Sequence, residues 1–397
     1  MKNRSYEELL LRKCVEIYER RKYYTKQEGD RRSAIFVKIQ DIFLTYRDPF
    51  EYKRYRDIHR AVLRLIQEGI LSGIPDEQGY FDKLRFFDEK IGECYERLGI
   101  TSAQEMSEKM RRLIDRYDRE DYPMLHTFCE AQRGCLEAHT KLSYGLDQNE
   151  EKMEDVLRAL TMMEGLEEEM TVRDFSEELF GDPEWFSQIR LSLQHILYDG
   201  LQPIVERDRV LEWFHLVDRP TYFHIKGAAM IQGRGSAVNV ERIPEGIAIG
   251  TQAIKEIEEI SVFENVVVVT DDESVFHETK ANGRVVIYPG GVMTRERTAL
   301  LRKIYESNPE LTYGYKGNID VYGFLTYEWL REQTGIPFLP FEMDLMTLQK
   351  YRRARKCREM NAAEKRLLGA DVLEAHREVL EYMNEHDCKL EWRRVYT

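Results

Sequence analysis

Apolar residues recur with helical spacing through the first half of the chain and change to short continuous runs in the second half. Residues 6–24 and 33–46 are expected to be helices, and residues 90–200 continue as long, charge-rich amphipathic segments. From about residue 201, apolar runs of strand length alternate with glycines and helical stretches, which is typical of an α/β domain. The sequence therefore predicts a multi-domain α+β protein with domains at 1–88, 89–200 and 201–397.

A helix followed by a turn and a strand is expected within the first domain. The helix opens at Pro49 and ends in Ala61–Leu71, and the strand-like stretch Tyr80–Phe87 follows a Gly- and Pro-containing turn. This order is that of a winged helix, in which the helix before the wing often enters the major groove. An ordinary helix-and-hairpin scaffold is the alternative. The basic residues on or beside this helix, which we expect to bind DNA, are Arg47, Lys53, Arg54, Arg56 and Arg60.

Acidic residues follow several expected strands of the C-terminal domain. The run Val266–Val269 leads into Asp271, and a later extended segment carries Asn318 and Asp320 on one side, because residues i and i+2 of a strand face the same way. Asp344 follows a further short apolar stretch. Acids at the carboxyl ends of neighbouring parallel strands hold metal ions in open α/β sheets. We therefore expect Asp271, Asp320 and Asp344 to bind Mg²⁺ or Mn²⁺; acids at strand ends are also common as turn and cap residues.

The composition indicates in which cellular compartment the protein is expected to function. No apolar run approaches the ~20 residues that a membrane span needs, and the N-terminus lacks the apolar core of a signal peptide. The six cysteines are scattered along the 397 residues, which favours reduced thiols. These features predict a cytoplasmic protein with no membrane partner.

The net charge of −13 is unevenly distributed. Residues 1–60 carry 16 Lys and Arg against 10 Asp and Glu, whereas residues 150–182 carry 12 acids against 3 bases. A second basic run consists of Arg352, Arg353, Arg355 and Lys356. This asymmetry predicts local contacts with the DNA backbone and acidic faces for protein partners, although solvated helix faces explain any single run equally well.

One cysteine–histidine pattern has the residue types of a zinc site. It comprises His126, Cys129, Cys135 and His139. On one continuous helix the two histidines would lie ~20 Å apart, so a zinc site requires a break at Gly134. The alternative is a helix with packed cysteines and histidines.

The segment from Val266 to Tyr351 carries a series of motifs in a fixed order. They are Val266–Val269, Asp271-Asp272, Phe276-His277-Glu278, Gly290-Gly291, the run 317–324 (Gly-Asn-Ile-Asp-Val-Tyr-Gly-Phe), and Met343-Asp344 with Thr347 and Tyr351. With these motifs the segment resembles the C-terminal Toprim domain of the JetD family, the nuclease subunits of bacterial Wadjet plasmid-defence systems. That domain is similar to the Toprim domain of topoisomerase VI. Weaker similarity extends upstream, at residues 17–22 and 172–182.

The resemblance implies a function and a set of partners. It implies an Mg²⁺-dependent endonuclease that cuts double-stranded plasmid DNA as a homodimer, alongside a condensin-like complex of SMC and kleisin subunits. Asp271, Asp320 and Asp344 would be catalytic and would hold the metal, with Asn318 as an auxiliary ligand.

Two positions depart from the family pattern. Asp271 stands where the family has Glu, and Asn318 replaces the first Asp of an Asp-x-Asp pair. Glu264 is the second choice for the missing Glu, because it precedes its strand. Asn offers a carbonyl oxygen but no charge, so the alternative is a catalytically inactive Toprim-fold subunit for DNA binding or assembly. A third interpretation is a winged-helix regulator with an unrelated α/β effector domain.

Overall fold

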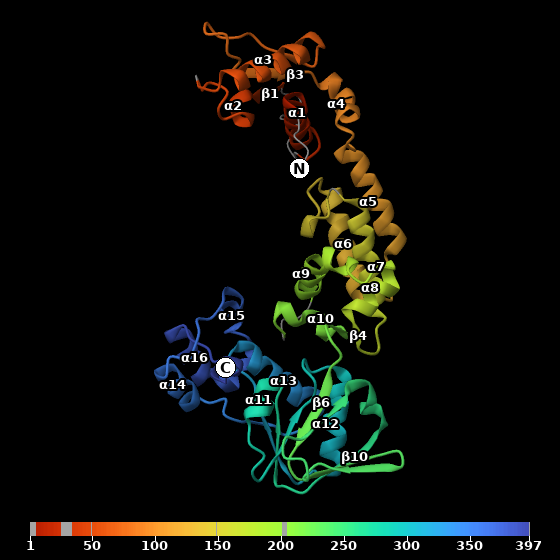
Figure 1. Cartoon of the computed structure of the whole chain (residues 1–397), viewed down its shortest axis with the longest axis vertical. Helices are drawn as coiled ribbons and strands as arrows, with labels where there is room; N and C mark the ends of the chain where they lie inside the picture. Colours follow the sequence, from red (N-terminus) through yellow and green to blue (C-terminus); the bar gives the residue numbers. More distant parts are fainter. Residues whose placement is uncertain (1–4, 25–33, 49, 148, 201–204, 397) are drawn as a thin grey trace. The chain divides into compact units, whose positions relative to one another are not determined.

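The computed structural model of the protein describes residues 5–24, 34–48, 50–147, 149–200 and 205–396. It contains both α-helices and several β-sheets (Figure 1). The chain divides into two compact units, residues 1–157 and residues 158–397. Each unit is described by itself.

The N-terminal unit contains a three-stranded antiparallel sheet in the order β1-β3-β2. Its elements are α1 (Tyr6–Lys22), β1 (Ile35–Lys38), α2 (Ile39–Ile42), α3 (Tyr52–Gln67), β2 (Leu71–Ser72) and β3 (Lys83–Phe86). The helix predicted over residues 33–46 is wrong, because Ile35–Lys38 is a strand. Ile35 and Val37 are buried while Phe36 and Lys38 are exposed, and this period of two suits a strand.

Helix α3 separates an apolar face from a basic face. Its buried residues are Ile58, Ala61, Val62 and Leu65, spaced three or four apart as one face of a helix requires. The expected helix and strand are present as α3 and β3, but the helix ends at Gln67, and Leu71, which was expected in the helix, begins the short strand β2. The helix begins at Tyr52, three residues after Pro49.

The segment from residue 90 to residue 200 is mainly helical, as predicted. It contains α4 (Ile91–Leu98), α5 (Ala103–Tyr117), α6 (Pro123–Glu137), α7 (Glu150–Glu164), α8 (Val172–Phe180) and α9 (Arg190–Gly200), with short 3₁₀ turns at Asp88–Lys90, Ser143–Gly145 and Trp185–Gln188. The helix start predicted at Thr171 is confirmed, since its side chain accepts a hydrogen bond from the Asp174 N–H at 3.1 Å. Gly181, in the left-handed conformation, ends this helix.

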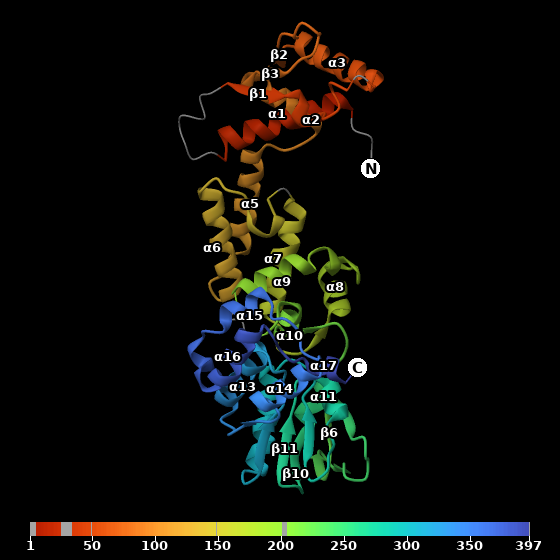
Figure 2. The ribbon, with the colours of Figure 1, turned by 90° about the vertical axis from the view of Figure 1, so that its left-hand side faces the viewer.

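The C-terminal unit is built around a six-stranded sheet in the order β14-β13-β11-β12-β6-β9 (Figure 2). Its strands are β14 (Leu339–Pro340), β13 (Thr312–Tyr315), β11 (Val266–Val269), β12 (Val285–Tyr288), β6 (Tyr222–Lys226) and β9 (Ile247–Gly250). The first four run parallel, and β6 and β9 run antiparallel to their neighbours. The expected mainly parallel sheet is therefore present, and the carboxyl ends of β11, β12, β13 and β14 meet at one edge.

Helices and two smaller sheets complete this unit. Besides α8 and α9, the helices are α10 (Val210–Trp213), α11 (Glu273–Glu278), α12 (Arg295–Ser307), α13 (Val321–Thr334), α14 (Leu345–Arg353), α15 (Ala362–Leu367), α16 (Arg377–His386) and α17 (Trp392–Val395), with 3₁₀ helices at Arg207–Arg209, Thr251–Glu256 and Asp371–His376. The smaller sheets are β10 (Ile257–Val262) with β7 (Ala229–Gly233) and β8 (Ser236–Asn239), and β4 (Met170–Thr171) with β5 (Leu216–Val217). Helices α12 and α13 pack on the central sheet through a shared apolar core, which holds the strand ends in place.

Candidate functional site

The segment that follows β13 is held by the C-terminal end of the chain. Ile319 forms an antiparallel bridge with Leu390, with N–H···O distances of 2.9 and 3.0 Å. The side chain of Ile319 is fully buried, so its neighbours Asn318 and Asp320 lie on the other side of this extended segment. The indole N–H of Trp392 donates to the Gly317 carbonyl at 2.8 Å. Contacts distant in sequence therefore fix the position of the candidate ligands.

One small cleft brings three of the predicted site residues together. Asp271, Asn318 and Asp320 all line it, and its volume is about 50 Å³. Glu206 and Arg209, which sequence reasoning missed, also line the cleft. The cleft lies at the edge of the sheet where β11 and β13 end, as expected for acids at the carboxyl ends of parallel strands.

Asp320 is the most deeply buried acid of the cleft, at 2% exposure. It caps α13, because its carboxylate accepts the Gly323 N–H at 2.6 Å. Burial raises the pKa of Asp320 to about 8, against the smaller opposing effects of the Gly323 N–H and the Lys389 ammonium. This carboxylate has too little positive charge around it for its degree of burial.

Asp271 lies beside an arginine. Its carboxylate is 3.5 Å from the guanidinium of Arg209, and only 17% of its side chain is exposed. Burial raises the pKa of Asp271, and Arg209 opposes this effect. The buried hydroxyl of Tyr315 also interacts with Asp271, and this contact lowers the pKa of the Asp271 carboxyl. The surroundings of Asp271 therefore include one cation and one buried hydroxyl group.

Asn318 uses its side-chain oxygen in a structural contact. Its Oδ1 accepts the backbone N–H of Trp392 at 3.0 Å. A carbonyl oxygen has a second lone pair, so this hydrogen bond leaves one acceptor position. The contact ties the segment after β13 to the start of α17.

The other two predicted metal ligands do not line this cleft. Asp344 follows β14 and is exposed, and its carboxylate caps α14 by accepting the Thr347 N–H at 2.7 Å. Glu264 precedes β11, so it lies at the opposite end of this strand from Asp271. It lines a separate pocket that also includes His277 and Lys280.

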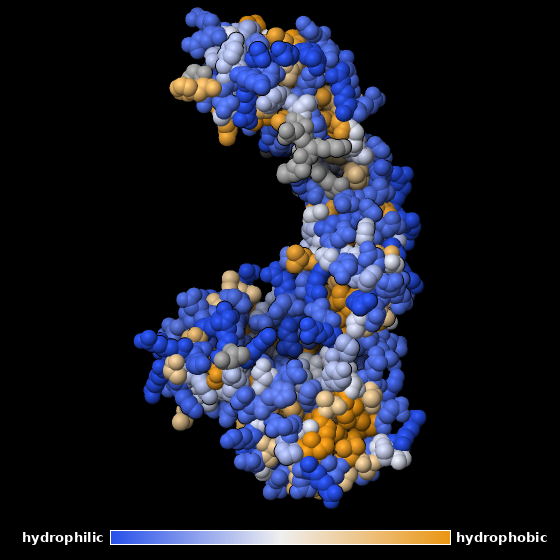
Figure 3. Space-filling view, viewed as in Figure 1, coloured by the Kyte–Doolittle hydropathy of each residue, from blue (hydrophilic) through white to orange (hydrophobic). Residues whose placement is uncertain are grey.

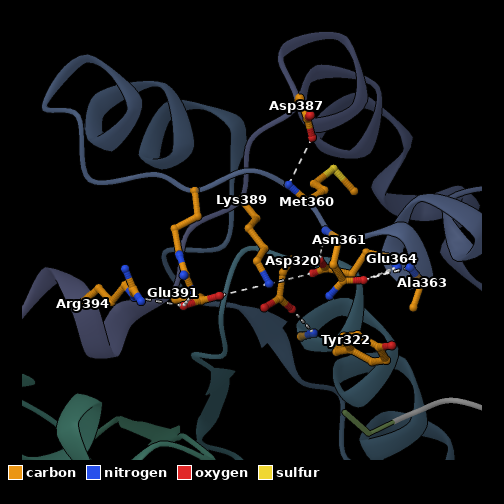
Figure 4. A network of polar contacts seen from close by, with 12 residues as sticks. Asp320, Tyr322, Met360, Asn361, Ala363, Glu364, Asp387, Lys389, Glu391 and Arg394 are labelled. Atoms are coloured by element: carbon orange, nitrogen blue, oxygen red, sulfur yellow. Dashed lines mark hydrogen bonds and ion pairs between the residues drawn. The ribbon is translucent and has the colours of Figure 1, made fainter. Parts of the chain in front are cut away.

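A buried network of charges adjoins Asp320 (Figure 4). The Lys389 ammonium lies 3.1 Å from Glu364 and 3.0 Å from Glu391, and the side chains of Lys389 and Glu364 are 6% and 0% exposed. Figure 4 shows the carboxylate of Asp320 close to this ion-paired lysine. The pairing of Lys389 with Glu364 joins residues 25 positions apart, so no local sequence signal marks it.

The predicted DNA-binding residues are all exposed. Arg47, Lys53, Arg54, Arg56 and Arg60 are exposed in the N-terminal unit, and Arg352, Arg353, Arg355 and Lys356 are exposed at and after the end of α14. Some already have local partners: Arg47 is 3.3 Å from Asp76, and Arg60 is 3.6 Å from Asp57. Each unit therefore presents its own basic group to solvent.

The cysteine–histidine pattern of residues 126–139 does not form a metal site. Helix α6 runs through Gly134 without a break. His126 is instead 2.7 Å from Asp118, and Cys129 is buried. The alternative interpretation of packed helical residues is therefore confirmed.

A second pocket of the C-terminal unit is more apolar than the acid cleft. An apolar patch lies over α12 (Figure 3), where a pocket of about 280 Å³ is lined in part by Ile254, Ala299 and Leu300. The two pockets share no lining residue. The acid cleft is thus the better candidate for chemistry on a charged substrate.

Comparison with known proteins finds a distant relative. The chain is 22% identical over 337 residues to the Wadjet protein JetD of Bacillus cereus (strain Q1), and the match covers 82% of each chain. No protein-family model matches the chain. Within the described part of the chain, none of the helices has the length and apolar character needed to cross a membrane. The chain is therefore similar, at low identity, to a Wadjet protein over most of its length.

Proposed function

We propose that this protein is a divalent-metal-dependent DNA endonuclease that acts in a Wadjet-type plasmid-defence system. The observation that carries the proposal is the shared cleft of Asp271, Asn318 and Asp320, at the edge where parallel strands end. The similarity to a Wadjet protein JetD over 82% of the chain supports the same assignment. By this analogy the protein acts as a homodimer with a condensin-like complex of SMC and kleisin subunits, on double-stranded DNA.

The donor set of the cleft fits Mg²⁺ or Mn²⁺. Both ions prefer oxygen ligands, and the cleft offers the carboxylates of Asp271, Asp320 and Glu206. Burial raises the pKa of all three carboxyl groups, as expected where acids are gathered without enough compensating charge. A bound divalent cation would supply that charge. Asp344 is a further candidate ligand, because it follows β14, which pairs with β13.

The residues that line the cleft would have different roles in the reaction. Asp271 and Asp320 would hold the cation, and Asn318 would lie beside them as a neutral oxygen donor. A divalent cation in this position stabilises the negative charge that develops on a scissile phosphate. Arg209 would attract the phosphate of the same substrate, because its guanidinium lies within the cleft.

DNA would be held by the two basic groups. In the proposed winged-helix arrangement of the N-terminal unit, α3 presents Lys53, Arg54, Arg56 and Arg60 to the backbone, and residues 352–356 contribute the second group. Arginine and lysine contacts to phosphate carry no sequence information. Binding is therefore expected to be largely independent of sequence.

A second candidate function is a subunit that keeps this fold without catalysis. It is favoured by one arrangement: Arg209 already neutralises Asp271 at 3.5 Å, while the Asn318 oxygen is bound to the Trp392 N–H. The first contact offsets the negative charge of Asp271, and the second occupies one lone pair of the neutral Asn318 oxygen. The two functions differ in metal binding, because an inactive site should bind no Mg²⁺ in a manner that depends on Asp320.

The test is cleavage of supercoiled plasmid by the full chain with Mg²⁺ or Mn²⁺, alone and with its SMC complex. We expect nicking or linearisation by the wild type and a loss of at least about 100-fold in Asp320→Ala. Asp371→Ala, which removes an exposed acid of the same unit, is the control and should cut normally. Equal cutting by Asp320→Ala would refute the assigned site. Absence of both cutting and Asp320-dependent Mg²⁺ binding would establish the non-catalytic function.

A further inference from the structure

A cluster of two histidines and one glutamate lies at the same sheet edge, outside the acid cleft. Nε2 of His224 and Nε2 of His277 are each 3.9 Å from Oε1 of Glu273. One donor atom from each of the three side chains lies within 4.8 Å of the other two. None of the three lines the cleft of Asp271 and Asp320.

Regular secondary structure places the three side chains together. Glu273 and His277 are four residues apart on α11, so they lie on one face of that helix. His224 lies in β6 opposite Tyr288, the last residue of β12. Figure 2 shows α11 beside β6. The cluster therefore joins a helix face to a strand and needs no loop to be rearranged.

The surroundings hold these elements in place. Asp272 caps α11 by accepting the Ser274 N–H at 2.8 Å, and the Lys226 ammonium donates to the His277 carbonyl at 3.0 Å. The ring of His224 packs edge-on against Phe276 and Tyr288, with centroids 5.4 and 5.5 Å away. Such packing fixes the imidazole of a metal ligand before the metal arrives.

Exposure differs between the three ligands in a way that suits metal entry. The side chain of His224 is only 15% exposed, whereas those of His277 and Glu273 are 53% and 58% exposed. One ligand is thus fixed and two are open to solvent and able to move.

We propose that His224, Glu273 and His277 form a binding site for a first-row transition-metal cation, with Zn²⁺ as the reference ion. Two imidazole nitrogens and one carboxylate oxygen are a common ligand set for zinc, whereas Mg²⁺ prefers oxygen alone. With metal–ligand distances of about 2.0–2.2 Å, tetrahedral donors lie roughly 3.4 Å apart. Side-chain rotations close the site when they shorten the two histidine–glutamate distances by about half an ångström and the histidine–histidine distance, which is at most 4.8 Å, by up to about 1.4 Å.

Three protein ligands leave a fourth position open. In zinc sites this position takes water or an anionic group of a substrate. Since Glu273 lies two residues after Asp271, a phosphate oxygen bound there would be near the acid cleft. The metal site goes beyond the proposed nuclease and does not depend on it, because it is tested without DNA.

The experiment is Zn²⁺ binding to the full chain, metal-free and reduced, measured by isothermal titration and by metal content after dialysis. We expect one Zn²⁺ per chain to be lost, or its affinity to fall at least about 10-fold, in His277→Ala and in Glu273→Gln. His195→Ala, which removes an exposed histidine of the same unit, should bind as the wild type does. Asp320→Ala should also retain this Zn²⁺, which separates the site from the acid cleft.

Co²⁺ provides a readout of the ligands themselves. The Co²⁺ form should show visible d–d bands without the near-ultraviolet thiolate band that cysteine ligands would produce, and His277→Ala should lose those bands. His277 is exposed, so the variant should fold normally, and its melting temperature without metal checks this. Failure of the wild type to bind Zn²⁺, or equal binding by His277→Ala, would overturn the proposal.

Discussion

The backbone of Asn318 touches Gly323 so closely that no other residue fits at position 323. A Cβ added to Gly323 would lie 2.2 Å from the carbonyl oxygen of Asn318 and 3.2 Å from the Asp320 carboxylate. Separations under 3.0 Å require one of the two segments to move. The absence of a side chain at residue 323 therefore allows the segment with Asn318 and Asp320 to fold back on the first turn of α13.

Gly323→Ala should damage both stability and the cleft. The backbone clash would displace the segment that carries Asp320 and weaken its cap on α13, so we expect a loss of about 2–4 kcal/mol in the free energy of unfolding. Urea unfolding measures this loss in the free energy of unfolding. Gly134→Ala is the matched control: this glycine is also in a helix, but its added Cβ meets nothing within 4 Å, so it should be neutral or stabilising by up to about 1 kcal/mol. A neutral Gly323→Ala would contradict the close contact.

Replacing only one partner of the buried ion pair between Lys389 and Glu364 should strongly destabilise the fold. Lys389→Met leaves the carboxylate of Glu364 buried without its partner, so we expect the free energy of unfolding to fall by roughly 3–5 kcal/mol. The double variant Lys389→Met/Glu364→Gln should recover part of the loss, because Gln is neutral and can still accept the Asn361 N–H.

Lys365→Met provides the comparison for Lys389→Met. It removes an ion pair with Asp387 in which both side chains are nearly half exposed, so the loss should stay below about 1 kcal/mol. Thermal and urea unfolding of all three variants give the measurement. Similar losses in Lys365→Met and Lys389→Met would mean that burial does not determine the strength of these pairs.

The sequence predicts the local parts of this structure well. The strands β11 and β12 are continuous apolar runs rich in valine and isoleucine, and Thr171 with Asp174 marks the start of α8. Such signals act over a few residues, so one sequence is enough to detect them. The same local method misread residues 33–46, because four strand residues lead directly into a short helix.

The site was only partly predictable for a physical reason. Asp271, Asn318 and Asp320 gather in one cleft because parallel strands end together, and that rule follows from chain order. The contacts of Arg209 with Asp271 and of Trp392 with Asn318 join residues far apart in the sequence. Neither contact has a periodic or capping signal, so only the folded chain reveals how the acids are neutralised.

A surface cluster in the N-terminal unit should make stability depend on pH. The His126 imidazole is 2.7 Å from Asp118, which raises the pKa of His126 above its ordinary value of 6.5. A raised pKa means that the ion pair is fully formed below pH 6.5 and is lost as the pH rises through the pKa of the folded state. The difference in unfolding midpoint between wild type and His126→Ala should therefore be larger at pH 5.5 than at about pH 8.5.

Protonation of Asp118 determines how the stability changes on the acidic side of the same pH profile. Burial alone would raise its pKa, but hydrogen bonds from His126 and Arg133 lower it below the ordinary value of 3.8. Its contribution is thus present above pH 3.8 and disappears as the pH falls through the pKa of the folded state. Urea unfolding across this range should show the His126 effect at its greatest near pH 5. An effect independent of pH would rule out the charged pair.

The basic face of α3 should govern the salt dependence of DNA binding. Each phosphate contact contributes about 0.9 to the slope of log affinity against log salt concentration, so Lys53→Ala/Arg54→Ala should lower that slope by roughly 1.8. Arg111→Ala/Arg112→Ala removes two exposed charges from α5 in the same unit and should leave the slope unchanged. Fluorescence anisotropy with duplexes of two unrelated sequences gives the slopes. Equal changes in both double variants would show that only net charge matters.

Asn318→Asp tests whether the missing charge limits metal binding in the cleft. The new carboxylate would lie beside Asp320 and could still accept the Trp392 N–H, so the fold should persist. Repulsion between the acids should lower the melting temperature without metal, and Mg²⁺ should restore it, because added carboxylate charge strengthens divalent-cation binding. We expect Mg²⁺ affinity to rise about 10-fold by isothermal titration, corresponding to roughly 1.4 kcal/mol.

Asn384→Asp, an exposed change of the same kind on α16, should alter neither the affinity nor the Mg²⁺ dependence of melting. If Asn318→Asp also leaves both unchanged, the cleft does not bind metal through these residues. If Asn318→Asp binds Mg²⁺ while the wild type binds none, the amide of Asn318 is the reason why the wild-type cleft does not bind the cation. If wild type already binds Mg²⁺ and the variant binds more tightly, the carboxylates of Asp271 and Asp320 suffice for binding in spite of Arg209.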